Sequence, residues 1–165
     1  MLYVGLDLSR KRLDWQALEP GGAVAAVGAV PPDRDGLRLL ARRLGDGEGV
    51  LAVIESMSGA RFVHDELELQ GWDVRIADAL KARGIAPLAC KTDTIDTWVL
   101  AELARLELVP EIWVPDPEVR AERERARFRL HLVKHRTALK NRVHSTLIQH
   151  GYQRPASDLP RSRRA

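Results

Sequence analysis

Residues 50–55 restrict this chain to a small number of possible folds. Val50, Leu51, Ala52, Val53 and Ile54 form an unbroken apolar run that ends directly on Glu55. A strand of this composition must be buried on both faces, which is typical of a parallel sheet with helices on either side. Open α/β sheets bind ligands at the carboxyl ends of such strands, so Glu55 is expected at that edge.

The segments around this strand predict a mixed sheet covered by helices. Alternating β-formers and turn residues indicate strands at 2–8, 13–18, 23–30 and 73–77. Apolar spacing predicts helices at 33–44, 59–71 and 92–108. Three strands followed by helix, strand, helix, strand and helix is the order of the RNase H-like fold, an α/β fold with a mixed five-stranded sheet and flanking helices.

The C-terminal part of the chain predicts one long helix. No Pro or Gly interrupts Glu118 to His150, and the apolar spacing there is that of a coiled-coil seam formed by Phe128, Leu132, Leu139, Val143 and Leu147. We therefore expect an RNase H-like domain at 1–115 and a long basic helix, acting as coiled coil or linker, at 116–150. Residues 151–165 are expected to be a disordered tail.

The charge of the chain is unevenly distributed. Residues 120–165 hold 13 of the 26 Lys and Arg residues but only 3 of the 23 Asp and Glu residues, a net charge of +10, which leaves −7 for residues 1–119. Such a basic segment favours a polyanionic partner, although a solvated, Arg-rich helix face is the simpler interpretation.

Composition also excludes several classes of protein. Cys90 is the only cysteine, which rules out a disulfide framework and a zinc site built from cysteines alone. The first twelve residues lack the pattern of a signal peptide, and no apolar run is long enough to span a membrane. We therefore expect a cytoplasmic protein.

Four carboxylates stand at positions that suit a metal site. Asp7 interrupts an apolar strand, Glu55 ends another, and Asp93 and Asp96 share one face near the start of a helix. Each has an ordinary structural explanation as a turn, capping or helix-dipole residue. Together, acids that converge on one cleft repel each other, and divalent cations relieve that repulsion. Mg²⁺ or Mn²⁺ bound there would support phosphodiester chemistry.

The motifs that carry these acids resemble a known family. The stretches YVGLDLS at 3–9, VIESMSG at 53–59 and KTDTIDT at 91–97 resemble the three acidic motifs of the DEDD-type transposases of the insertion sequence 110 group, and residues 132–144 resemble their long helical segment. The resemblance implies a RuvC-like domain in which Asp7, Glu55, Asp93 and Asp96 bind Mg²⁺ and act in catalysis. It also implies DNA recombination of an insertion sequence, guided by an element-encoded RNA.

The same family has a second, C-terminal domain that carries a serine nucleophile. Ser145, Ser157 and Ser162 lie in the wrong context to replace that nucleophile. We therefore expect a truncated transposase, an isolated domain or one half of a split protein, with the serine domain supplied in cis or in trans.

Basic residues beside the last acidic motif and along the long helix are candidates for contacts to a nucleic-acid backbone. They are Lys91, Arg120, Arg123, Arg127, Lys134, Arg136, Lys140 and Arg142. For Lys91 a plain surface position is an equal alternative. For the other seven residues the alternative is that they only solubilise the flank of a coiled coil. We expect a homo-oligomer to form through this coiled coil. His131, His135 and His144 are interpreted as polar surface residues, and the four tryptophans as core or interface residues.

Three other functions compete with a transposase domain. One is a RuvC-type junction endonuclease that is complete in itself, and another is a non-catalytic, dimeric regulator that binds DNA or RNA. A sugar kinase or actin-like ATPase shares the Gly-x-Asp-x-Ser pattern at residues 5–9. It would need a Gly-rich phosphate loop after the first strand, for which residues 10–12 are a poor substitute.

Overall fold

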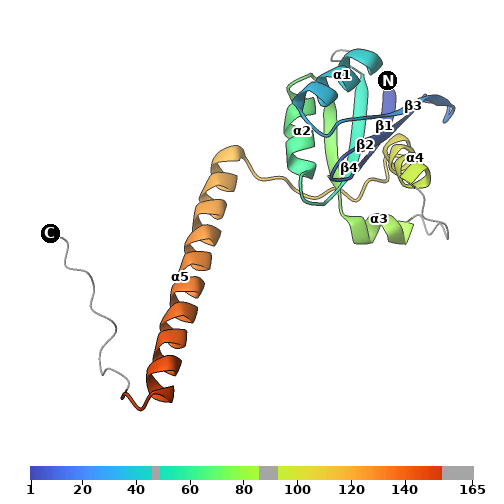
Figure 1. Cartoon of the computed structure of the whole chain (residues 1–165). Helices are drawn as coiled ribbons and strands as arrows, with labels where there is room; N and C mark the ends of the chain where they lie inside the picture. Colours follow the sequence, from blue (N-terminus) through green and yellow to red (C-terminus); the bar gives the residue numbers. More distant parts are fainter. Residues whose placement is uncertain (46–48, 86–92, 154–165) are drawn as a thin grey trace. The chain divides into compact units, whose positions relative to one another are not determined.

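The computed structural model describes residues 1–45, 49–85 and 93–153, without the side chains of residues 93–95. Its five-stranded sheet has the order β3-β2-β1-β4-β5 (Figure 1). The strands are β1 (Leu2–Leu8), β2 (Leu13–Leu18), β3 (Val24–Val30), β4 (Val50–Glu55) and β5 (Asp73–Ala77). β1, β2 and β3 pair antiparallel, whereas β4 lies parallel to both β1 and β5. This mixed α/β sheet confirms the predicted fold class and is consistent with an RNase H-like fold.

Helices cover both faces of the sheet, and a long helix follows. They are α1 (Arg34–Leu44), α2 (Ala60–Glu68), α3 (Ala79–Ile85), α4 (Asp93–Arg105) and α5 (Pro117–Gln149). The sequence did not predict α3, because seven residues are too few to show a helical period. Its start is marked locally by Asp78, whose carboxylate accepts hydrogen bonds from the backbone N–H groups of Leu80 and Lys81 at 3.0 and 3.2 Å.

The larger core lies under α1 and α2. Leu37 and Leu40 of α1 and Val63 of α2 are fully buried in the apolar cluster formed by one face of the sheet, together with Trp15. Of the two candidate caps in the sequence, Asp33 and Asp35, it is Asp33 that caps α1, since its carboxylate accepts a hydrogen bond from the backbone N–H of Gly36 at 2.8 Å. This cap satisfies one of the backbone N–H groups that the first turn leaves without a helical partner.

The smaller core lies between α4 and the other face. Leu100 and Ala104 pack there against Leu51 and Val53 of β4. The sequence predicts that this helix runs to residue 108, and that part of the prediction is wrong, because α4 ends at Arg105 and Leu106 beyond it is 47% exposed. β4 is therefore buried on both faces, as its composition requires.

The tryptophans divide between core and surface. Trp15 and Trp72 are buried, whereas Trp98 and Trp113 are 38% and 73% exposed. The indole of Trp72 donates a hydrogen bond to the carbonyl oxygen of Gly45 at 3.2 Å. Trp15 and Trp72 are therefore core residues. For Trp98 and Trp113 the core interpretation is wrong, and an interface role stays a prediction.

The chain divides into two compact units, residues 1–114 and 115–165. In the second unit α5 is 33 residues long, and most of its side chains are exposed, including the predicted seam residues Phe128, Leu132, Leu139 and Val143. No helix in the described part of the chain is both long and apolar enough to cross a membrane. The predicted disordered tail falls largely on residues 154–165, which lie outside the described residues.

Candidate metal centre at the strand ends

Asp7 and Glu55 are neighbours at the carboxyl ends of two parallel strands. Leu6 of β1 is in register with Ile54 of β4, so Asp7 and Glu55 form the next step along the two strands. Neighbouring strands lie about 4.8 Å apart. Val53 faces α4, and side chains two residues apart in a strand point to the same face. Both carboxylates therefore project to the α4 side of the sheet, where both residues are partly exposed.

Gly5 allows α4 to lie directly on β1. A Cβ atom at residue 5 would stand 1.8 Å from the carbonyl oxygen of Thr97 and 2.8 Å from the backbone nitrogen of Ala101. No side chain fits in that space, so the helix backbone contacts the strand backbone. Gly5 precedes Asp7 by two residues, so this contact places α4 immediately beside the two carboxylates.

The direction of α4 is set at its other end. Arg105 donates a hydrogen bond to the carbonyl oxygen of Pro20 at 3.4 Å, in the turn between β2 and β3. That turn lies at the amino-terminal end of β1, because Tyr3 pairs with Leu18. The helix thus runs opposite to β1, and its first turn lies toward the end of the sheet that carries Asp7 and Glu55.

An ion pair within α4 holds Arg105 for this contact. The guanidinium Nε and Nη2 donate to the two carboxylate oxygens of Glu102 at 2.8 and 2.6 Å. These hydrogen bonds lower the pKa of Glu102 below its usual 4.5 and raise that of Arg105. A carboxylate with a lowered pKa stabilises the folded state above its usual pKa, and this stabilisation is lost as the pH falls through the lowered value.

The remaining acids of the predicted set belong to that first turn. α4 begins at Asp93, whose side chain lies outside the described residues, as does all of Lys91. Asp96 is exposed one residue before Thr97. Within the described part of the chain, no three His, Cys, Asp or Glu side chains form a group that could hold a metal ion. The four-carboxylate site therefore stays a prediction.

Asp14 also belongs to this edge, and the sequence did not reveal it. Antiparallel pairing sets Asp14 directly opposite Asp7, so both side chains lie on the same face of the sheet. Its carboxylate pairs with Arg12, whose Nε donates to Oδ1 at 2.8 Å. A signal was available, because a tight turn at residues 9–12 fixes which residues of the hairpin face each other.

The predicted basic residues of the second unit lie along α5, where Arg120 and Lys140 are half-buried and the other five are exposed. Arg120, Arg123 and Lys140 have interaction partners within the chain. The rings of His131 and His135, one helical turn apart, lie with their centroids 4.2 Å apart. Both of these histidines are exposed, as predicted, but His144 is buried with 8% exposure, so its interpretation as a surface residue is wrong.

These features define an α/β protein with an RNase H-like sheet and carboxylates at the ends of its central parallel strands. The model of the DEDD transposase family of the insertion sequence 110 group, described as "Transposase", matches residues 4–151. The chain therefore belongs to this transposase family, whose members transfer DNA. A comparison with curated proteins gave no match.

Proposed function

We propose that residues 1–114 form a domain that binds Mg²⁺ and DNA for strand cleavage during transposition of an insertion sequence. The observation that carries this proposal is the juxtaposition of Asp7 and Glu55 on parallel strands, beside the first turn of a helix that supplies Asp93 and Asp96. Membership of a transposase family supports DNA as the substrate.

The donor set fits a hard divalent cation. Asp7, Glu55, Asp93 and Asp96 would hold Mg²⁺ or Mn²⁺, since carboxylate oxygens are the ligands these ions prefer. When bound, the metal supplies charge stabilisation for an attacking and a leaving phosphodiester oxygen. Asp7 lies on the central strand between β2 and β4, so its carboxylate is within reach of both neighbours. It is the residue expected to matter most.

The second unit supports a nucleic-acid contact of its own. With 3.6 residues per turn, Arg120, Arg123, Arg127 and Lys134 fall on one side of α5, away from the apolar seam. Arg136, Lys140 and Arg142 flank that seam. We propose that the first group contacts phosphates of DNA or of a guide RNA without reading sequence. The seam then remains available to a second copy of the chain.

The proposal is tested by the Mg²⁺ dependence of DNA binding. Branched DNA should bind the wild-type chain more tightly as Mg²⁺ rises, because the metal removes the repulsion between the carboxylates and the phosphates. Asp7→Asn and Glu55→Gln should lose this dependence, since they no longer hold the metal. Glu19→Gln, which removes an exposed acid at the opposite end of β2, is the matched control and should behave like the wild type.

The same reactions separate the competing functions. Efficient cleavage by the purified chain, lost in Asp7→Asn, would favour a self-contained junction endonuclease. Binding that ignores Mg²⁺ and survives replacement of all four acids, without cleavage, would favour a non-catalytic regulator and overturn the proposal.

A further inference from the structure

Arg12 occupies a defined place beside the candidate metal centre. Its guanidinium contacts Asp14 through both Nε and Nη2, and Asp14 lies directly opposite Asp7 in the hairpin. The guanidinium of Arg12 is thus held beside Asp14, which is the cross-strand neighbour of Asp7. Arg10 and Lys11 belong to the same turn, but neither forms an ion pair with the residues that the structure describes.

The backbone under Arg12 is fixed as well. The backbone N–H and the side-chain hydroxyl of Ser9 both donate to the carbonyl oxygen of Arg12, each at 2.8 Å. The Arg12 side chain is nevertheless 63% exposed, whereas that of Asp14 is only 15% exposed. A guanidinium has five N–H donors. Because the contacts with Asp14 use Nε and Nη2, Nη1 keeps its donors for a ligand in solvent.

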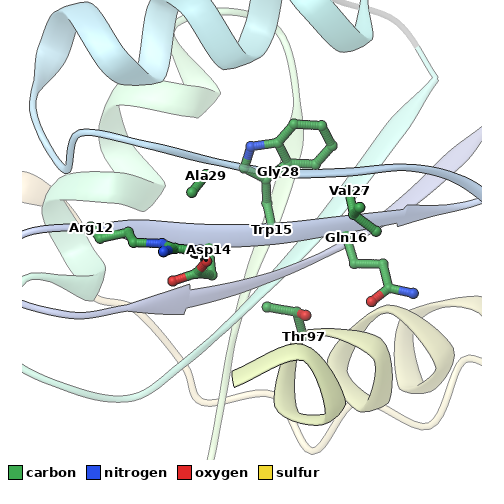
Figure 2. A pocket seen from close by; sticks show the side chains of 8 residues that line it. All are labelled: Arg12, Asp14, Trp15, Gln16, Val27, Gly28, Ala29 and Thr97. Atoms are coloured by element: carbon green, nitrogen blue, oxygen red, sulfur yellow. Dashed lines mark hydrogen bonds and ion pairs between the residues drawn. The ribbon is translucent and has the colours of Figure 1, made fainter. Parts of the chain in front are cut away.

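A pocket of about 200 Å³ adjoins this ion pair (Figure 2). Asp14 and Gln16 of β2 and Thr97 of α4 line it, with Val27 and Ala29 of β3 on the far side. Figure 2 shows Arg12 and Asp14 side by side at one end, and the ring of Trp15 on the opposite face of β2. Gln16 is 95% buried, and its carbonyl oxygen has no hydrogen-bond partner in the described structure.

We propose that Arg12 binds a backbone phosphate next to the scissile one, and that Asp14 positions its guanidinium for this contact. The inference rests on the proposed function, because it takes DNA as the substrate. A guanidinium recognises phosphate through paired N–H donors in a fixed plane. The pocket lined by Gln16 gives the nucleoside attached to that phosphate space beside β2.

The experiment measures the binding of branched DNA at fixed Mg²⁺ over a range of salt concentrations. Arg12→Ala should weaken binding about tenfold and reduce the slope of log K against log salt by about 0.9, the value for one phosphate contact. Arg10→Ala removes the same charge from the same turn and should change the affinity much less. Arg12→Lys should restore only part of the loss, since an ammonium cannot pair in the same way.

Asp14→Asn separates positioning from bulk electrostatics. The substitution removes a negative charge near the DNA, so simple electrostatics predicts tighter binding. If Asp14 positions Arg12, binding should instead weaken about threefold or more, and Arg12→Ala should add little to Asp14→Asn. Melting temperatures of all variants identify any loss of folding. Because the Arg12 side chain is exposed, the Arg12 variants should stay folded even if Asp14→Asn does not.

Equal effects of Arg12→Ala and Arg10→Ala, or tighter binding by Asp14→Asn, would overturn this inference and leave the proposed function intact. If the wild-type chain binds no DNA, the inference and the proposed function both fail. If Gln16→Leu lowers the affinity for intact DNA but not for DNA that is abasic at one particular nucleotide, the pocket holds the base of that nucleotide. If the loss is the same for intact DNA and for every abasic DNA, no base enters the pocket.

Discussion

At the scale of single residues, the position of α4 depends on a missing side chain. Gly5 has an ordinary strand conformation, so its role is the space it leaves and not its backbone freedom. The carbonyl oxygen of Thr97 occupies the volume that a Cβ atom at residue 5 would need. The contact joins β1 to the helix that carries Asp93 and Asp96, so one glycine governs both packing and the geometry of the candidate site.

Gly5→Ala is therefore expected to be severely destabilising. The new methyl group would meet helix backbone, which cannot move aside as a flexible side chain can, so α4 must shift away from the sheet. We expect a loss of at least about 3 kcal/mol in the free energy of unfolding, measured by urea denaturation. Gly21→Ala is the control, because a Cβ atom there meets nothing within 4 Å. Equal stability of the two variants would contradict the close contact.

At the scale of elements, α5 exposes a stripe of apolar side chains, which is unfavourable for a helix that stands alone in water. Phe128, Leu132, Leu139 and Val143 are 44–65% exposed, and Leu139, Arg142 and Val143 line a shallow groove along the helix. Helices in proteins draw most of their stability from packing an apolar face against another element. A second copy of the chain presents the same stripe and is the partner that we propose.

Leu139→Glu should therefore convert an oligomer to a monomer. A carboxylate in the seam would lose its hydration on association, and even when paired with a flanking arginine its desolvation costs more than the pair returns, in addition to the lost leucine contact. Sedimentation equilibrium at micromolar concentration measures the change. Leu130→Glu places the same charge on the opposite side of α5 and should leave association unaffected. A wild-type chain that is monomeric at this concentration would exclude the seam as an interface.

At the scale of the whole molecule, the candidate site should couple metal binding to folding. Three strands supply Asp7, Asp14 and Glu55, and α4 supplies the other acids. Only the folded chain brings these carboxylates together, so a cation that relieves their repulsion stabilises the native state over the unfolded one. Stability in the presence of metal then reports the site without any need for activity.

Millimolar Mg²⁺ or Mn²⁺ should raise the melting temperature of the wild type by a few degrees. Glu55→Gln should melt at least as high as the wild type without metal, because one repelling charge is gone, yet it should gain little from Mg²⁺. Glu19→Gln should keep the full shift. The measurement is differential scanning calorimetry at constant ionic strength. Equal shifts in wild type and Glu55→Gln would show that the ion does not bind at this edge.

Local patterns were sufficient to predict most of the elements and the fold class. The alternation at 2–8 and 13–18 and the apolar run before Glu55 each act over a few residues, so sequence alone determines them. The predicted strands also placed Asp7 near the end of one strand and Glu55 at the end of another, because a strand's limits are local. The prediction missed α3 and extended α4 beyond Arg105 to residue 108, since short helices and helix ends carry weak periodicity.

Tertiary structure alone decided how these pieces meet. The pairing of Asp14 with Asp7 follows from hairpin register, and the contact between Arg105 and Pro20 joins residues 85 apart in the chain. The contact of α4 with Gly5 depends on a helix backbone meeting a strand backbone on one face of the sheet, which no local pattern encodes. Sequence determined which residues form strands and helices, because those choices depend on near neighbours. The folded chain decided which carboxylates and which cation share an edge, because that depends on packing between distant segments.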